Sequence, residues 1–405
     1  MKYLLGILLI LFASFTDIFL FRIGIIPLQP SQFVIPLFLV VGAIKYSILD
    51  LVDIFKSHTF TMFAFLLFLS MVYSAVSPAS PDVIILDIVL NLITLLLYVF
   101  MVHFFRTEKK SLVFLVMFIS FVVLAASVWY DYFVGLPKFT KAAEEMIRKG
   151  GFGENPNQAA SAMKFLGLCV LVYLDSLKGK RTLFILALLV SVFLTFSRGG
   201  IASVILILIF GTANEWSTKF KISSAVLFKS FFKMAFLFTG LYFCLVMFAG
   251  IMKANFPEFA SGAGGERIDV LLGKSEKSVI AEDVGSGGGR GDLLVKYFKS
   301  FAKNPIGYGT AYSADESINY LDTHNYYLYL AVNFGALALI CYLIYIGFGI
   351  KLSFKVDQFY YLIFVVLLIF EGFVTHHIFF NRSMLISLAF FDSLIYSKHI
   401  KNAFS

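Results

Sequence analysis

Long apolar runs constrain this sequence more than any other feature. Of its 405 residues, 60% are hydrophobic and only 14% are charged, whereas a globular chain is about half apolar and about a quarter charged. A helix that crosses a bilayer needs roughly 20 apolar residues, and the sequence offers about twelve such runs. They lie near residues 3–21, 33–51, 60–77, 83–105, 111–133, 158–177, 182–197, 199–213, 228–252, 323–350, 357–379 and 382–397. This composition excludes a soluble globular domain.

The same runs predict helices and not strands. Backbone polar groups in lipid must be hydrogen-bonded within a helix or a closed barrel, and barrel strands alternate apolar with polar residues. These runs are too long and too uniformly apolar to alternate. We therefore expect an all-α, polytopic membrane protein with about twelve transmembrane helices. Its first run, which begins MKYLLGILLILFASF, lacks a small-x-small cleavage site, so we expect it to be retained as the first helix.

One sizeable polar segment interrupts the apolar pattern and divides the chain. Helices one to nine are expected within residues 1–252, with a shorter loop at 134–157. The long segment, charged and punctuated by glycine, covers 253–322, and residues 323–405 form helices ten to twelve and a polar tail. Because function concentrates in loops held by a rigid scaffold, we expect the chemistry beside this long segment, which would carry short helices of its own.

The short loops predict the orientation, because lysine and arginine are enriched on the cytoplasmic side of a membrane. With the N-terminus inside, the cytoplasmic connections are rich in lysine, and the short outside connections carry single arginines, Arg22, Arg198 and Arg382. Both termini are then cytoplasmic, and segments 134–157 and 253–322 both lie outside. The net charge of +8 follows from this topology. We therefore expect the lipid bilayer, and no nucleic acid, among the partners.

Arg198 stands between two apolar runs, in TFSRGG (Thr195–Gly200). Arginine at the edge of a membrane is costly and tends to be functional. Ser197 can cap the following helix, whose free N–H groups would suit an anion, while Gly199 and Gly200 let the backbone turn and approach a ligand closely. The alternative is an interfacial arginine whose side chain extends to lipid headgroups.

The loop at 134–157 ends in Asn155-Pro156-Asn157, a turn that opens the next helix. Asn157 is predicted to cap that helix; alternatively, its side chain lines a polar cavity. A short amphipathic helix is expected earlier in the loop, at 141–149, where Gly150 would stop it.

Within the long segment, GSGGGRGD (Gly285–Asp292) is expected to form a flexible approach to a helix that begins near Asp292. Asn304-Pro305 ends this helix, and GYG (Gly307–Gly309) forms a turn. The glycine run follows no strand and lacks the GK[ST] ending of a nucleotide-binding loop. We interpret it as a tether that lets Arg290 reach a ligand at the membrane surface.

His324 lies in DTHNYYLYL, where the long segment re-enters the membrane. Imidazole titrates near neutrality, and Asp322 and Asn325 flank this one, although a lone histidine is more often structural. His376 and His377, at the outer end of the eleventh helix, are within reach of the same aqueous face and are further candidates. Neither HExxH nor DxD occurs outside the membrane, so we expect no metal site.

Taken together, these features resemble the O-antigen ligase and polymerase superfamily of bacterial inner-membrane glycosyltransferases. The matching motifs, in chain order, are GFGENPNQAA (Gly151–Ala160) before a helix, TFSRGG (Thr195–Gly200), an arginine before a short helix, a GYGT turn, and HN (His324, Asn325) with Gly335 ten residues after the asparagine. The motifs cover roughly residues 150–350, and the topology covers the whole chain. The combination of their order and their shared side of the membrane carries the resemblance.

The resemblance implies a GT-C-like fold with an active site on the periplasmic face of a bacterial inner membrane. Such proteins take a glycan from an undecaprenyl diphosphate carrier and pass it to an acceptor sugar. Ligases attach O-antigen to the lipid A core, and polymerases extend another lipid-linked repeat unit. Polymerases often carry a second arginine-rich motif, which segment 134–157 lacks. We therefore expect a ligase, with an O-antigen or exopolysaccharide polymerase as the alternative.

The resemblance also implies roles for individual residues. The residues expected to bind substrate are Arg198, Arg290, Asn325 and Asn157. Arg198 and Arg290 match the diphosphate-binding arginines of the family, with Arg267 as the alternative to Arg290, and His324 matches its essential histidine, as a base or a phosphate ligand. Forked guanidinium groups neutralise a diphosphate well, so neither a metal nor another cofactor is expected.

A transporter of lipid-linked glycans is the alternative from another class. Membrane-edge arginines around a basic cavity would serve it equally well. However, the halves of the sequence show no inverted repeat, and few helix centres carry charge, Lys45 and Lys164 being the exceptions. The polar segment also lies on one side only. These features favour the enzyme.

Overall fold

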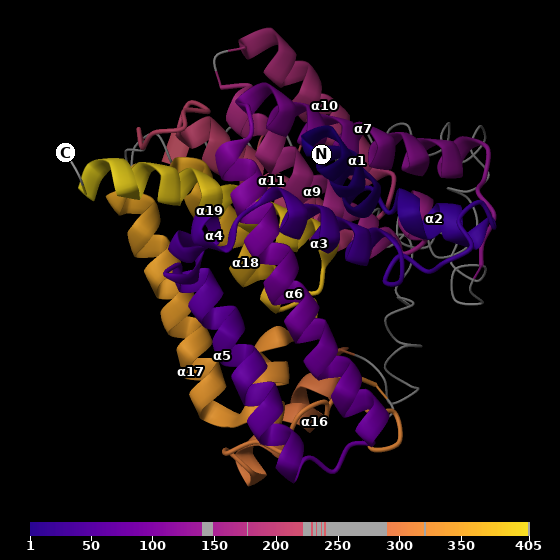
Figure 1. Cartoon of the computed structure of the whole chain (residues 1–405). Coiled ribbons are helices and arrows are strands. Elements are labelled where there is room, and N and C mark those ends of the chain that lie inside the picture. The colour runs from indigo at the N-terminus through magenta and orange to yellow at the C-terminus, as the bar shows by residue number, and fades with distance from the viewer. Residues whose placement is uncertain are drawn as a thin grey trace. The chain divides into compact units, whose positions relative to one another are not determined.

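The computed structural model describes residues 1–139, 149–175, 177–221, 290–319 and 321–403, with a few residues between 228 and 239. Every regular element within these residues is helical, which confirms the all-α class (Figure 1). The elements are α1 (Lys2–Ala13), α2 (Thr16–Arg22), α3 (Val34–Lys45), α4 (Ile48–Phe55), α5 (His58–Tyr73), η1 (Ser74–Val76), α6 (Pro81–Thr107), α7 (Lys110–Phe133), η2 (Gly151–Gly153), α9 (Pro156–Tyr173), α10 (Lys178–Phe193), α11 (Arg198–Ala213), α16 (Arg290–Lys303), α17 (Tyr326–Lys355), α18 (Phe359–Gly372) and α19 (Arg382–Ala403).

Four helical stretches of the described residues are long and apolar enough to cross a membrane. They are His58–Val76, Pro81–Thr107, Lys110–Phe133 and Tyr326–Lys355. The number rises to six if each of two bent helix pairs counts as one span. The twelve spans predicted from the sequence therefore stay a prediction, and the ninth run, 228–252, lies mostly outside the described residues.

The two bent pairs replace continuous helices that were predicted near 3–21 and 33–51. Helices α1 and α2 meet at 73°, and Phe15 between them has a left-handed φ of 59°, which a continuous α-helix does not allow. Helix α3 ends at Lys45, and Ser47 then caps α4 in a capping box with Asp50. A hydropathy average hides such breaks because the flanking residues stay apolar.

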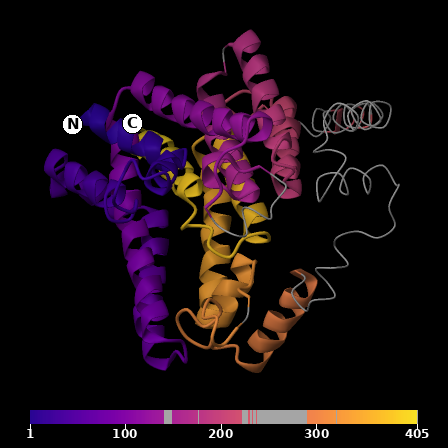
Figure 2. The same ribbon diagram turned by 90° about the vertical axis from the view of Figure 1, so that its right-hand side faces the viewer.

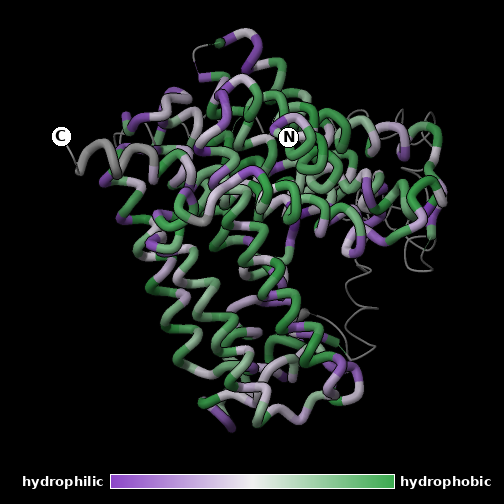
Figure 3. The backbone as a smooth tube through the Cα atoms, in the orientation of Figure 1, coloured by the Kyte–Doolittle hydropathy of each residue, from purple (hydrophilic) through white to green (hydrophobic). Residues whose placement is uncertain are grey.

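The described residues form two compact units, and each is considered by itself. The first unit comprises residues 1–121, 165–173 and 290–405. Helix α6 packs against α5 and α19, and α17 packs against α5, α16 and α18. Figure 1 and Figure 2 show α16 and the loop after it near one end of α5, α6 and α17. Figure 3 shows that hydrophobic residues dominate these three long helices, whereas hydrophilic residues recur around α16 and its loop.

Helix α17 is broken at Gly335, and the segment Gly307–Gly309 packs against the break. Gly335 has φ +77° inside the helix. The amide of Tyr308 donates to the carbonyl of Val332 at 2.8 Å, and the amide of Gly309 donates to that of Asn333 at 2.9 Å. The predicted turn is displaced to Pro305–Ile306, where the Gly307 amide donates to the Asn304 carbonyl at 3.1 Å. The backbone of the Gly307–Gly309 segment that follows satisfies carbonyl groups that the break would otherwise leave open.

The second unit comprises residues 122–164 and 174–289. Its helices α10 and α11 pack together. The buried carboxylate of Asp131 accepts hydrogen bonds from the amide of Gly151 at 3.0 Å and from Lys138 Nζ at 2.6 Å. The Asp131 carboxylate thus binds one residue near the start and one near the end of the loop at 134–157. Lys164 is buried and donates to the Ser203 hydroxyl at 3.2 Å.

Candidate functional site

His324 lies on a tightly bonded turn at the entrance to α17. Its backbone is left-handed, with φ +47°, a conformation that is uncommon for residues other than glycine. The Thr323 hydroxyl donates to the carbonyl of Asn325 at 3.0 Å, and the side chain of Asn325 accepts from the Leu328 amide at 3.1 Å. Asn325 is thus the N-cap of α17. The sequence DTHN therefore holds His324 on a defined backbone.

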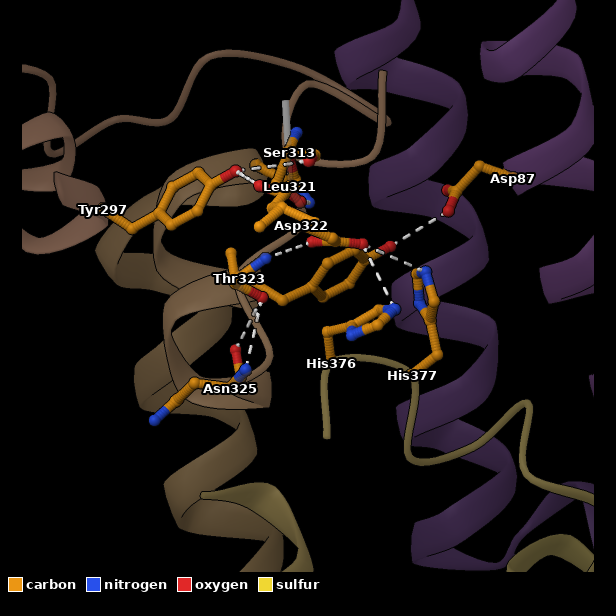
Figure 4. A network of polar contacts seen from close by, with 11 residues as sticks. Asp87, Tyr297, Ser313, Leu321, Asp322, Thr323, Asn325, His376 and His377 are labelled. Carbon is orange, nitrogen blue, oxygen red and sulfur yellow. Dashed lines mark hydrogen bonds and ion pairs between the residues drawn. The ribbon is translucent and has the colours of Figure 1, made fainter. Parts of the chain in front are cut away.

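Two further histidines converge on the carboxylate that precedes His324. His376 Nε2 lies 3.4 Å from Asp322 Oδ2, and His377 Nε2 lies 3.5 Å from the same oxygen. Figure 4 shows both rings pointing at this carboxylate from the segment between α18 and α19. All three side chains are partly buried, with 14–28% of their surface exposed. Segments far apart in the sequence thus supply one polar cluster.

The cluster also contains His324 itself. Its ring meets the ring of His376 edge to face, with centroids 5.1 Å apart, and the rings of His376 and His377 lie 4.4 Å apart. The sequence analysis placed His376 and His377 only within reach of the same aqueous face, and the structure brings the His376 ring into contact with that of His324. Three of the six histidines in the chain gather around Asp322.

Burial keeps His376 and His377 neutral. It lowers the pKa of His376 below its ordinary value, and the carboxylate of Asp322 opposes this only partly. Burial lowers the pKa of His377 to about 4, with a further contribution from the neighbouring His376. Both rings therefore present lone pairs or N–H groups at neutral pH without adding positive charge.

A second group of hydrogen-bonded polar side chains joins α5, α6 and α17 next to this cluster. The Tyr329 hydroxyl donates to Asp87 Oδ1 at 3.0 Å, and Ser70 donates to Asp87 Oδ2 at 3.2 Å. The ring of Tyr329 also meets His377 edge to face at 5.1 Å. The sequence analysis missed Asp87, although a charged residue within a predicted span was a usable signal.

Helix α16 supports the loop that carries Asp322. The buried Tyr297 hydroxyl donates to the carbonyl of Leu321 at 2.5 Å and to that of Ser313 at 3.4 Å (Figure 4). Asn333 of α17 accepts from the Ser313 amide at 3.0 Å through its side-chain oxygen. The loop is therefore tied to two helices, which positions the DTHN turn.

The predicted arginines fall in different parts of the chain. Arg290 is the first residue of α16 in the first unit, two residues before the predicted helix start at Asp292. Arg198 is exposed and begins α11 in the second unit. Arg267 lies outside the described residues, as do residues 141–148 of the predicted amphipathic helix at 141–149.

Of the local features predicted around Arg198, the helix cap is confirmed. The Ser197 hydroxyl accepts from the Gly200 amide at 3.3 Å and caps α11. The two glycines differ in role. A Cβ on Gly199 would enter open space, whereas a Cβ on Gly200 would lie 2.6 Å from that of Ala160. Gly200 thus allows α11 to approach α9 closely, and the close approach to a ligand that was expected of these glycines stays a prediction.

The prediction that Asn157 caps α9 is wrong. Asn155 is the cap, because its side-chain oxygen accepts from the amides of Asn157 at 2.9 Å and of Gln158 at 3.4 Å. Pro156 occupies the first helical position, where its fixed φ and missing N–H are favourable, and this places the cap one residue before it. Asn157 lies in the first turn and is exposed.

The expectation that no metal-ligand cluster exists also needs correction. One ring nitrogen of each of His376 and His377 and an oxygen of Asp322 all lie within 4.8 Å of one another, a grouping that can hold a metal ion. No short motif revealed it, because the aspartate and the histidine pair are far apart in the sequence. The prediction that activity is independent of metal stays untested.

Comparison with known proteins bears on the family. Residues 183–343 match the family model described as O-antigen ligase, a range that includes Arg198, Arg290 and His324 but ends before His376. No curated protein matches the chain. The apolar helices and this family indicate a multi-pass membrane protein. The match confirms the resemblance of this chain to the O-antigen ligase and polymerase superfamily of membrane glycosyltransferases.

Proposed function

We propose that this protein is an O-antigen ligase that moves a glycan from undecaprenyl diphosphate to a sugar of the lipid A core. The observation that carries the proposal is the capped DTHN turn, which presents His324 beside Asp322 and His376. The turn itself, though not His376, lies within the range of the family match. A polymerase that extends O-antigen or an exopolysaccharide is the alternative within the superfamily. The missing arginine-rich motif at 134–157 favours the ligase.

The proposed reaction is attack by an acceptor hydroxyl on the anomeric carbon of the donor sugar. A new glycosidic C–O bond forms, the bond from that carbon to the diphosphate oxygen breaks, and undecaprenyl diphosphate leaves with the bonding electrons. Negative charge grows on the diphosphate in the transition state. Arg198 and Arg290 would neutralise it through their forked guanidinium groups, and transfer would then need no metal ion.

Two alternative roles are proposed for His324 in this mechanism, general base and phosphate ligand. As a base it would take the proton of the attacking hydroxyl, a role that suits imidazole near neutral pH. As an imidazolium it would instead bind a phosphate oxygen. His376 stands edge to face with His324 and contacts Asp322, so it would orient the ring in either case. Asn325 supports the same turn as a helix cap, and a contact of Asn325 or Asn157 with substrate remains a prediction.

We propose the bacterial inner membrane as the location, with both termini in the cytoplasm and the DTHN turn on the periplasmic side. The lysine-rich short loops support this orientation. It would place the turn on the side where lipid-linked glycans are assembled into lipopolysaccharide. Fusion of a reporter after Lys303 and, separately, after Lys180 tests it, because the two fusions should report opposite sides.

The decisive experiment is complementation. The gene is expressed in one bacterial strain that lacks its O-antigen ligase and in another that lacks its polymerase, and lipopolysaccharide banding is recorded. Restored capping of the lipid A core in the first strain supports the ligase. A ladder that appears only in the polymerase-deficient strain would replace the ligase by the polymerase. The His324→Ala variant, expressed at an equal level, should restore neither.

A further inference from the structure

Two imidazoles of one dipeptide converge on one carboxylate oxygen. The Nε2 atoms of His376 and His377 lie 3.4 and 3.5 Å from Asp322 Oδ2. These separations exceed the usual 2.7–3.2 Å, roughly, of an N–H···O hydrogen bond. Both rings nevertheless aim the same kind of atom at the same point (Figure 4). An arrangement of this kind is expected around a small central cation.

The observed separations agree with tetrahedral coordination. With bonds of about 2.0–2.1 Å from a zinc ion to nitrogen or oxygen, two corners of a tetrahedron lie about 3.3–3.4 Å apart. The two contacts to Asp322 Oδ2 measure 3.4 and 3.5 Å, and the three ligand atoms all lie within 4.8 Å of one another.

We propose that Asp322, His376 and His377 bind a divalent first-row transition ion of the Zn²⁺ class. Two neutral imidazole nitrogens and one carboxylate oxygen form a ligand set that suits zinc and its neighbours. Calcium and magnesium prefer sets made of oxygen alone. Three protein ligands leave a fourth position open for water or for an oxygen of a ligand.

The surroundings of His377 fit an outer shell for such an ion. With Nε2 on the metal, Nδ1 carries the proton, and metal-bound histidines normally donate it to a further partner. The Nδ1 atoms of His376 and His377 are buried and have no protein partner among the described residues. A cavity lined by His377, Asn91 and Thr94 leaves about 20 Å³ for the centre of a water molecule, which is enough for one.

The site lies beside the proposed catalytic histidine without depending on it. His376 contacts the ring of His324, and Asp322 precedes it by two residues. If the proposed function holds, an ion bound here would take the carboxylate of Asp322 and the imidazole of His376 as ligands, so that neither could support His324. It would also place positive charge next to the His324 ring. Added zinc should then slow transfer reversibly, and the metal-free protein should be the active form.

Binding of the metal alone tests the proposal without any assay of transfer. The full-length protein, purified in detergent with a tag free of histidine and stripped with chelator, is titrated with Zn²⁺ by calorimetry and with Co²⁺ by visible absorption. We expect one ion per chain and the intense absorption of tetrahedral Co²⁺. His376→Gln and His377→Gln should each weaken binding at least about tenfold, with elution profiles like that of the wild type.

His324→Gln provides the matched control, because it removes a neighbouring imidazole that is not a proposed ligand. It should bind Zn²⁺ with nearly wild-type affinity. Absence of stoichiometric binding by the wild type would overturn the proposal, as would equal binding by the wild type and both ligand variants. Because these readouts are independent of glycan transfer, failure of the metal site and failure of the proposed function remain distinguishable.

Discussion

Gly307 and Gly335 meet backbone to backbone, and neither position leaves room for a side chain. A Cβ on Gly307 would lie 2.6 Å from the amide nitrogen of Gly335, and a Cβ on Gly335 would collide with the carbonyl oxygen of Ile306. Both glycines have positive φ, +104° and +77°. The contact fixes the loop after α16 to the break in α17, the helix whose N-terminus carries the DTHN turn.

Replacement of Gly335 by alanine should therefore destabilise the protein. The left-handed backbone costs about 1–3 kcal/mol for a residue with a side chain, and the collision with Ile306 adds to this. We expect a lower midpoint of thermal unfolding in detergent, measured by size-exclusion chromatography of heated samples. Gly347→Ala is the control, since it lies in the same helix and its Cβ would enter open space. Equal midpoints for both variants would contradict the structural role of the break.

A turn after α16 could be predicted from the sequence, but neither its location at Pro305–Ile306 nor the contact of the following residues with α17 could. Glycine and proline mark a turn locally, whereas the partner of that turn is a backbone break inside an apolar run. The run near 323–350 has nothing in its hydropathy that separates a broken helix from a straight one. The break is stabilised by tertiary hydrogen bonds, which the amides of Tyr308 and Gly309 donate to carbonyl groups of α17.

The candidate site was predictable to a similar degree. The sequence predicts that His324, His376 and His377 face one side of the membrane, because each lies at the end of an apolar run. Their convergence on Asp322 could not, since no spacing rule links a loop residue to a histidine pair from another segment. Asp87 was overlooked because the average hydropathy of its run conceals a single carboxylate.

Asp315 ties the loop after α16 to the start of α6. Its carboxylate accepts from the amide and hydroxyl of Ser317 at 2.8 and 2.6 Å, and from the amide of Ser80 at 2.6 Å. The hydrogen bonds from Ser317, and then those from Ser80, favour the ionised form and lower the pKa of Asp315 to about 2. Because the pKa in the unfolded chain is near its ordinary value of about 3.9, the stabilisation is fully present above that pH and is lost as the pH falls toward 2.

Asp315→Asn should therefore lower the unfolding midpoint at neutral pH and flatten its decline between about pH 4 and pH 2. The measurement is thermal unfolding across that range in a detergent whose charge does not change with pH. Glu316→Gln is the matched control, because Glu316 is the exposed neighbour. If the acid slope of Asp315→Asn equals that of the wild type, the hydrogen bonds to Asp315 do not contribute to the acid stability.

Arg198→Lys should lose most transfer activity while the protein still inserts and accumulates. Lysine keeps the charge but lacks the fork that grips two phosphate oxygens, so a diphosphate clamp should respond and a membrane anchor should not. The measurement is transfer from a lipid-linked donor by purified protein. Arg181→Lys is the control, since Arg181 bonds the carbonyl of Asp175 at 2.8 Å and has no proposed role in transfer. Near-normal transfer by both Arg198→Lys and Arg198→Ala would remove Arg198 from the site.

His324→Ala separates the two roles proposed for this histidine. If His324 is the base, the variant should lose more in kcat than in donor affinity. The rate of the wild type should also decrease as the pH is lowered and the imidazole becomes protonated. If His324 binds phosphate, the change should instead weaken donor binding. Donor affinity is measured directly, by binding of a non-transferable donor analogue, and compared with kcat from transfer assays. Unchanged kcat and unchanged affinity together would exclude both roles.

Transfer should persist in excess EDTA, because arginine side chains are proposed to take the place of a cation at the diphosphate. If Asp322, His376 and His377 also bind an inhibitory ion, chelation should leave the rate equal to or above that of untreated protein. The measurement is the initial rate before chelation, after it, and after stepwise return of Zn²⁺, Mg²⁺ or Mn²⁺. A rate that disappears in EDTA and returns with magnesium or manganese would contradict the metal-free mechanism. Attention would then move to the acidic residues nearest the motifs, which are Asp292, Asp315, Glu316 and Asp322.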